Sequence, residues 1–240
     1  MIYGLDLFSG IGGLTLALSE WVKPVAYCEN DRYAQGVLLS RQQSGALPLA
    51  PIWDDVRTLS GSMVPAVDII YGGFPCQDIS TAGNGKGLAG ERSGLFFHVE
   101  RLVGDIKPRF VFLENVPAIR TRGGDVVAAR LAKLGYDCRW GVLSASDVGA
   151  THKRERWFLL ACRVGNPYYE GPRTLGEVSQ RKAPDTGRRT RWDTEPGICR
   201  VANGVPARVD RIKTLGNAVV PEQAREAFVT LLFGKRDTNA

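Results

Sequence analysis

Apolar runs and helically spaced apolar residues alternate along the first half of the chain. The runs predict strands over residues 2–8, 25–28, 67–71 and 109–113. Between them, apolar residues three and four positions apart predict helices over about 14–21, 31–41, 95–106 and 125–134. Strands that alternate with helices indicate a mostly parallel sheet with helices on both faces. We therefore expect an α/β fold of the doubly wound type.

The pattern changes beyond the last of these helices. Two apolar stretches, 136–145 and 156–164, predict the strands of a hairpin appended to the parallel sheet. Periodicity is lost from 165 to 206, where Gly, Pro, Arg and Thr dominate, and a last helix is expected over about 222–233. We therefore divide the chain into a first domain at 1–164, a short irregular region at 165–205 and a C-terminal segment at 206–240 that returns to the first domain.

The composition is that of a globular protein, with 44% hydrophobic and 23% charged residues in 240. The N-terminus lacks the basic and apolar regions of a signal peptide, and no apolar run is long enough to cross a membrane. The five cysteines are scattered, with no C-x-x-C pair, which argues against a disulfide or zinc framework. We therefore expect a cytoplasmic protein that binds neither metal nor membrane.

The net charge of +6 is concentrated in the C-terminal third. Residues 1–150 carry 14 Lys and Arg against 15 Asp and Glu, whereas residues 151–240 carry 17 against 10. A basic region beside a nearly neutral domain indicates a polyanionic partner such as nucleic acid. On charge alone, a basic surface that only aids solubility explains the asymmetry equally well.

The strand at 67–71 leads into Gly72, Gly73, Phe74, Pro75 and Cys76. The two glycines allow a sharp turn and a close approach of the backbone to a ligand. A thiol on a loop after a buried strand lies where α/β enzymes hold a nucleophile, although a lone cysteine is more often an inert apolar side chain. Glu114 ends the strand at 109–113, so we expect it in the same crevice as Cys76.

The turn at 8–13 is rich in glycine and opens a helix, an arrangement in which backbone N–H groups face a ligand. Its spacing is not G-x-G-x-x-G, which favours a small adenosyl ligand over a dinucleotide. Glu29 ends the second strand, about 20 residues further on, where an acid can bind ribose hydroxyls. Asp31 fits better as a helix cap. Either Asp54 or Asp55 could accept a hydrogen bond from an adenine amino group.

Six segments, taken in order, resemble those of the cytosine-C5 DNA methyltransferase family. They are a methyl-donor loop at 6–13, the ribose and adenine acids Glu29 and Asp55, a nucleophile loop at 73–77, a base-binding strand end at 114–116, an Arg-x-Arg element at 154–156 and a closing motif at 216–220. The resemblance covers almost the whole chain. It implies a Rossmann-like methyltransferase fold, S-adenosyl-L-methionine as cofactor and a cytosine in duplex DNA as substrate. Residues 165–205 then form the target-recognition region.

The resemblance also implies a role for individual residues. The catalytic residues are Cys76, Glu114, Arg154 and Arg156. The cofactor-binding residues are Phe8, Ser9, Gly10, Ile11, Gly12, Gly13, Glu29, Asn30, Asp55, Val56, Pro75, Asn217 and Ala218. The substrate-binding residues are Gln77, Ser80, Asn115 and Val116, together with Arg188, Arg189 and Arg191 in the basic region. We expect a monomer, which a cognate restriction endonuclease can accompany.

The chemistry explains why these residue types are needed. Cytosine C5 is a poor nucleophile, but addition of the Cys76 thiolate at C6 makes C5 able to attack a methyl sulfonium. A protonated Glu114 would donate to N3 of the base as Cys76 adds, which requires burial to raise its pKa. Arg154 or Arg156 would favour the thiolate form of Cys76. The cytosine must leave the base stack before a side chain can reach C6.

Two features depart from the family, and three alternatives remain. The family usually has Gln where this chain has His152, and the region 165–205 is shorter than usual. The nearest alternative is an RNA cytosine-C5 methyltransferase of the same fold. A catalytically silent DNA-binding module is a second, against which the retained Cys76, Glu114 and two arginines argue. The glycine spacing disfavours the third, a nicotinamide oxidoreductase.

Overall fold

One mixed sheet of seven strands organises the parts of the chain that the computed structural model describes, residues 1–75, 94–165 and 208–233. The strands are β1 (Ile2–Leu7), β2 (Val22–Cys28), β3 (Ile52–Trp53), β4 (Ile69–Gly73), β5 (Phe110–Asn115), β6 (Tyr136–Ser144) and β7 (Glu155–Arg163). Their order across the sheet is β3-β2-β1-β4-β5-β7-β6. The first five strands are parallel, and the β6–β7 hairpin joins the sheet with β7 antiparallel to β5.

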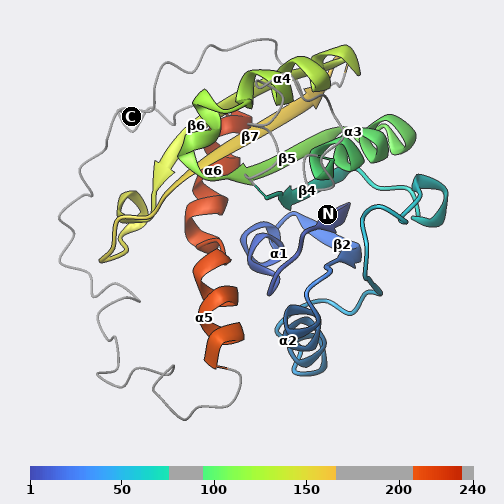
Figure 1. Ribbon diagram of the computed structural model, residues 1–240. Helices are drawn as coiled ribbons and strands as arrows, with labels where there is room; N and C mark the ends of the chain where they lie inside the picture. The colour runs from blue at the N-terminus through green and yellow to red at the C-terminus, as the bar shows by residue number, and fades with distance from the viewer. Residues whose placement is uncertain (76–93, 166–207, 234–240) are drawn as a thin grey trace.

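Helices cover both faces of this sheet (Figure 1). They are α1 (Gly13–Leu18), α2 (Arg32–Gln43), α3 (Leu95–Ile106), α4 (Gly124–Lys133), α5 (Arg208–Asn217) and α6 (Pro221–Phe233), with short 3₁₀ turns η1 (Gly61–Met63), η4 (Pro117–Thr121) and η5 (Ala145–Val148). The sheet separates two apolar clusters. Side chains of α3 and α4 contribute to one cluster, and those of α1 and α6 to the other. Neighbouring residues of β5 face opposite clusters, Val111 one and Phe112 the other, which explains why this strand is apolar throughout.

Most of the predicted elements are confirmed. Helix α3 has the predicted bounds, the hairpin pairs as expected, and Asp31 caps α2 by accepting hydrogen bonds from the backbone N–H groups of Tyr33 and Ala34. Helix α1 ends at Leu18, earlier than its apolar spacing suggested. Helix α5 was not predicted, because it is mostly polar and only three of its ten residues, Val209, Ile212 and Leu215, are apolar.

The interpretation of Gly72 and Gly73 as a sharp turn was wrong. Both residues belong to β4, which extends further than the apolar run, and neither has a positive φ. A Cβ at Gly72 would lie 2.3 Å from the backbone oxygen of Leu7, and one at Gly73 would lie 2.7 Å from Glu114 Oε2. The glycines are therefore needed for close approach to the neighbouring strands, and the chain can turn only after β4.

The carboxyl ends of β1, β2, β4 and β5 lie along one edge of the sheet. The predicted site residues follow these strands, which is the position expected for ligands in an open α/β sheet. Among the described residues, no helix is long and apolar enough to cross a membrane.

Candidate active site

The turn after β1 is held in a conformation that requires glycine. Gly10 and Gly12 have φ values of 54° and 84°, in the left-handed region. Phe8 also has a positive φ, 54°, which is costly for a side chain of its size and marks a strained turn. Ser9 secures the turn to the next strand, since its Oγ accepts a hydrogen bond of 3.2 Å from the backbone N–H of Cys28.

Glu29 connects this glycine turn to the end of β2. Its Oε2 accepts a hydrogen bond of 2.7 Å from the backbone N–H of Gly10, and its Oε1 accepts one of 2.7 Å from that of Asp31. A carboxylate has about four acceptor positions, so ribose hydroxyls can still bind to it. An added Cβ at Gly10 would meet no atom within 4 Å, so there is open space beside the turn.

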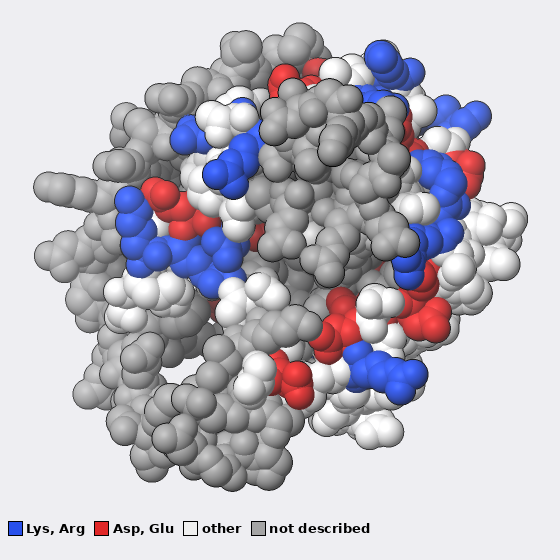
Figure 2. Space-filling model, in the orientation of Figure 1, with Lys and Arg blue, Asp and Glu red and all other residues white. Residues whose placement is uncertain are grey.

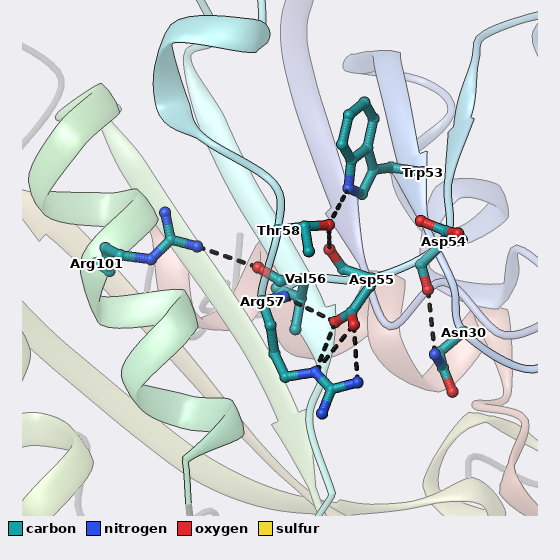
Figure 3. A network of polar contacts seen from close by, with 8 residues as sticks. All are labelled: Asn30, Trp53, Asp54, Asp55, Val56, Arg57, Thr58 and Arg101. Carbon is teal, nitrogen blue, oxygen red and sulfur yellow. Dashed lines mark hydrogen bonds and ion pairs between the residues drawn. The ribbon is translucent and has the colours of Figure 1, made fainter.

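Asp55 lies in the turn after β3, where Arg57 binds it (Figure 3). The guanidinium Nε of Arg57 is 2.9 Å from Asp55 Oδ2, and the backbone N–H of Arg57 donates to Oδ1. These hydrogen bonds and the charge of Arg57 lower the pKa of Asp55. Asp55 is therefore ionised at neutral pH and can accept hydrogen bonds. Asn30 donates a hydrogen bond of 3.3 Å to the backbone oxygen of Asp54, which connects this turn to the end of β2.

Glu114 and Arg156 form the second half of the site, at the ends of β5 and β7. Arg156 Nε lies 2.8 Å from Glu114 Oε1, and both side chains are largely buried. Burial raises the pKa of Glu114 to about 7, although the nearby charges of Arg156 and Arg154 oppose this rise. A substantial fraction of Glu114 is therefore protonated near neutral pH, when it can donate a hydrogen bond.

Arg154 has a different set of contacts from Arg156. Its Nη2 donates hydrogen bonds of 2.7 Å to the backbone oxygens of Gly216, at the end of α5, and of Ala218, between α5 and α6. Val219, next in this segment, packs so closely on α1 that a Cβ at Gly13 would lie 2.8 Å from Val219 Cγ1. The predicted closing motif thus lies against the first residue of the helix that the glycine turn opens.

The two halves of the site lie side by side because their strands are neighbours. Strand β1 pairs with β4, with Leu7 opposite Gly72, and β4 pairs with β5, with Gly73 opposite Glu114. The amide of Asn115 donates a hydrogen bond of 2.9 Å to the backbone oxygen of Phe74, which secures the start of the predicted nucleophile loop. A group bound at the glycine turn would therefore be close to one held by Glu114.

Comparison with known proteins agrees with this geometry. The model of the family described as C-5 cytosine-specific DNA methylase matches residues 2–195. The chain belongs to this family. The Type II methyltransferase M.CviJI of Paramecium bursaria Chlorella virus IL3A is 34% identical over 96% of this chain and 59% of its own length. M.HaeII of Haemophilus aegyptius is 35% identical over 73% of this chain and 55% of its own length.

Solved structures of other proteins show the same fold. A protein described as a DNA modification methyltransferase encoded within a prophage (E. coli) has a TM-score of 0.57 and 27% identity, over 68% of this chain and 47% of its own. Spodoptera frugiperda DNMT2 has a TM-score of 0.62 at 20% identity, over 76% of this chain and 56% of its own. The Rossmann-like fold expected from the resemblance is therefore confirmed. The chain spans between 47% and 59% of the length of these proteins.

The structure brings together one part of the predicted methyltransferase site. A hydrogen bond connects the glycine turn to Glu29, and another connects Asn30 to the turn that carries Asp55. Val56, which follows Asp55, is buried. Val116 donates its N–H to the Asn115 side chain, Pro75 is exposed, and Asn217 ends α5. The predicted residues that lie outside the described part of the chain are Cys76, Gln77, Ser80, Arg188, Arg189 and Arg191.

Buried polar side chains to which the sequence assigns no individual role connect β1, α1 and β4. Asp6 is fully buried, and Thr15 Oγ1 donates a hydrogen bond of 2.6 Å to its Oδ2. The Tyr71 hydroxyl lies 2.9 Å from the same Thr15 oxygen. Burial raises the pKa of Asp6 to about 7. An acid and a threonine nine residues apart carry no signal of this contact, which arises only when α1 packs on the sheet.

Proposed function

We propose that this protein transfers a methyl group from S-adenosyl-L-methionine to C5 of a cytosine in duplex DNA. The observation that carries the proposal is the position of Glu114. It is a buried carboxyl group with a raised pKa, paired with Arg156 and next to the start of the loop that contains Cys76. Membership of the C-5 cytosine-specific DNA methylase family supports the reaction class.

The residues at the ends of β1, β2 and β3 fit an adenosyl cofactor. The open space beside Gly10 admits a ligand, Glu29 offers acceptors to ribose hydroxyls, and ionised Asp55 offers acceptors to the adenine amino group. When bound, S-adenosyl-L-methionine supplies an electrophilic methyl group on a sulfonium, and S-adenosyl-L-homocysteine is the product left after the transfer. Glu29 and the glycine turn would hold it beside β4, from which the nucleophile loop starts.

The protein's own residues would activate the base. The Cys76 thiolate adds to cytosine C6 while Glu114 gives its proton to N3. The C5–C6 double bond becomes a single bond, and a new C4–C5 double bond beside the C4 amino group forms an enamine that is nucleophilic at C5. Arg156 then stabilises the carboxylate that Glu114 becomes. After C5 takes the methyl group, loss of the C5 proton to a base allows the C6–S bond to break, and N3 returns its proton to Glu114. Aromaticity is restored, and the thiolate is released.

A covalent trap tests this proposal. Duplex DNA that contains 5-fluorocytosine in place of cytosine should form an adduct with the protein that survives a denaturing gel, because fluorine cannot leave C5 as a proton does. The adduct should require both the methyl donor and Cys76. Cys76→Ser should abolish both the adduct and methyl transfer while leaving cofactor binding intact.

Cys138→Ser is the matched control, because Cys138 is a half-buried thiol on β6, away from the site. It should form the adduct normally. Absence of an adduct at a proven target cytosine would show that addition at C6 is not the mechanism. Methyl transfer to transfer RNA but not to duplex DNA would instead establish the RNA methyltransferase alternative.

A further inference from the structure

Two arginines outside every predicted motif bind backbone oxygens of the cofactor turns. Arg41, on α2, donates a hydrogen bond of 2.6 Å from Nη1 to the backbone oxygen of Ile11. Arg101, on α3, donates from Nη2 to the backbone oxygens of Val56 and Leu59, at 3.1 and 2.7 Å. Figure 3 shows Arg101 reaching from its helix toward the turn that carries Asp55.

These contacts secure segments that the sheet does not hold. Ile11 lies between the two glycines with positive φ, Gly10 and Gly12. The turn from Asp55 to Leu59 follows β3, a strand of only two residues. Hydrogen bonds from a charged donor are stronger than those between neutral groups, and each guanidinium projects from a regular helix. Each helix thus limits the positions that the backbone of its turn can take.

We propose that Arg41 and Arg101 are positioning residues for the methyl-donor site. Arg41 sets the glycine turn near Glu29, and Arg101 sets the turn that presents Asp55. Neither needs to touch the ligand. The inference rests on the proposed function, because it takes these two turns to be the binding site of S-adenosyl-L-methionine.

Arg101→Met is the informative variant, because methionine keeps an unbranched apolar side chain and removes all the donors. We expect the dissociation constant of S-adenosyl-L-methionine, measured by calorimetry without DNA, to rise about tenfold. KM for the cofactor should rise similarly, and kcat at saturating cofactor and DNA should change less than about twofold, since the chemistry at Glu114 is untouched. Arg41→Met should behave alike, and the double variant should multiply the two effects, because the two arginines bind different backbone oxygens.

Arg163→Met is the matched control, because Arg163 Nη1 also donates to a backbone oxygen, that of Lys107, at the opposite edge of the sheet. It should leave cofactor affinity unchanged, even if it lowers the melting temperature. Unchanged affinity in Arg101→Met, or an equal loss in Arg163→Met, would overturn the inference. If the wild-type protein itself fails to bind the cofactor, the proposed function is wrong.

Two exposed arginines lie shortly after β5, the strand that carries Glu114. Arg120 and Arg122 lie in and just after η4, the turn that follows β5, and their side chains make no hydrogen bond or ion pair within the described residues. Figure 2 shows Lys and Arg side chains, with Asp and Glu between them, near the tip of the β6–β7 hairpin at the left of the view. In this hairpin Lys153 is paired with Glu155, and Arg154 and Arg156 bind Ala218 and Glu114.

The turn that carries these arginines is well anchored. The backbone N–H of Val116 donates to Asn115 Oδ1 at 2.8 Å, and the backbone N–H of Arg122 donates to the backbone oxygen of Ile119 at 3.1 Å. Ile119 is fully buried. Two cations that have no partner among the described residues lie on a fixed turn, next to the strand end that would hold the base. They match the flanking phosphates of a nucleic acid.

We infer that Arg120 and Arg122 bind phosphates of the duplex DNA whose cytosine reaches Glu114. This inference also rests on the proposed function. In Arg120→Gln/Arg122→Gln, the slope of log affinity against log salt concentration should become shallower by about 1.8, because two phosphate contacts are lost. Binding of S-adenosyl-L-methionine should not change.

Lys23→Gln/Lys133→Gln removes the same charge from exposed positions at the amino edge of the sheet, in β2 and at the end of α4. Its salt slope should match that of the wild type. An unchanged slope in the arginine variant, or an equal change in both variants, would contradict the inference. If wild-type protein does not bind duplex DNA at all, the proposed function fails instead.

Discussion

Opposing effects act on single carboxyl groups in this protein, and Glu114 is the clearest case. Burial favours its protonated form, whereas Arg156 at 2.8 Å favours the carboxylate. The balance, a pKa of about 7, lets one side chain donate a proton to a base and then remain stable as an anion. Asp55 shows the opposite balance, since it is less buried and Arg57 lowers its pKa. The proton-donating acid and the cofactor-binding acid thus differ through their surroundings.

Methyl transfer should therefore depend on the protonation of Glu114. With S-adenosyl-L-methionine and DNA saturating, we expect kcat to fall as the pH rises above about 7, because the proton donor is lost. Glu114→Gln should lower kcat by about two orders of magnitude or more and remove this pH dependence. An unchanged pH profile in that variant would assign the titrating group elsewhere.

The free energy of unfolding should fall with rising pH, as kcat does. Glu114 and Asp6 both have folded pKa values of about 7, above their ordinary values of 4.5 and 3.8. An acid whose pKa is raised by folding contributes its full stabilisation of the folded state below its unfolded pKa. This stabilisation is lost as the pH rises through the folded pKa. The free energy of unfolding should therefore decrease between about pH 4 and pH 7. Urea titrations across this range should show a smaller decrease in Glu114→Gln.

Glu29 should contribute to cofactor affinity in two ways. Glu29→Ala removes the acceptors for the ribose and also releases the backbone N–H groups of Gly10 and Asp31. We expect S-adenosyl-L-methionine binding to weaken by about 1.5–3 kcal/mol. Glu29→Gln should weaken it less, because one acceptor oxygen remains. Calorimetry that gives wild-type affinity for Glu29→Ala would place the ribose elsewhere.

At the scale of elements, the site depends on close packing between segments distant in sequence. Helix α6 is attached to the hairpin by Gln223, which donates hydrogen bonds of 2.7 and 2.6 Å to the backbone oxygens of Leu143 and Arg154. Arg154 in turn binds the segment between α5 and α6. The C-terminal helix, the hairpin and the first helix therefore hold one another around the cofactor turn.

A substitution at Gly13 would test the packing of the closing segment on α1. In Gly13→Ala the new Cβ would lie 2.8 Å from Val219 Cγ1 and 3.2 Å from the Val219 backbone oxygen, so the closing segment must move. We expect a loss of about 1–3 kcal/mol in the free energy of unfolding and weaker cofactor binding.

Gly36→Ala provides the control, because Gly36 lies inside α2 and an added Cβ would meet no atom within 4 Å. This substitution should stabilise the protein by about 0.5–1 kcal/mol through helix propensity. Denaturant unfolding of both variants measures the contrast. A neutral Gly13→Ala would show that the closing segment can shift at little cost.

At the scale of the whole molecule, the chain spans 59% of the length of M.CviJI. Apart from Gly165, the proposed recognition region at 165–205 lies outside the described residues. About 40 residues rarely form a core of their own without metal or disulfides. From its length, we expect this region to offer few rigid positions for reading bases.

We therefore expect a short target of roughly two to four base pairs, with salt-dependent affinity. Bisulfite sequencing of a plasmid methylated by the pure protein measures the target directly. Replacing Arg188, Arg189 and Arg191 with Ala should weaken DNA binding without changing cofactor affinity. A strict requirement for six or more base pairs would contradict this expectation.

Local sequence signals determined much of the fold and the types of residue at the site. Strands, helices, the hairpin and the acids at strand ends follow from apolar periodicity and from glycine placement, which act over a few neighbouring residues. The resemblance added the roles of Cys76 and Glu114. Helix α5 was not predicted because its sequence is mostly polar, although its few apolar residues recur every three positions.

Only the tertiary structure decided which groups meet. Strand order made Gly72 and Gly73 sites of close approach, and it placed Arg156, 42 residues after Glu114 in the chain, against that acid. The contacts of Arg41 and Arg101 with backbone oxygens carry no sequence signal, because any residue supplies a carbonyl. The pKa of Glu114 depends likewise on burial and on a distant charge, which arise only when strands far apart in sequence pack together.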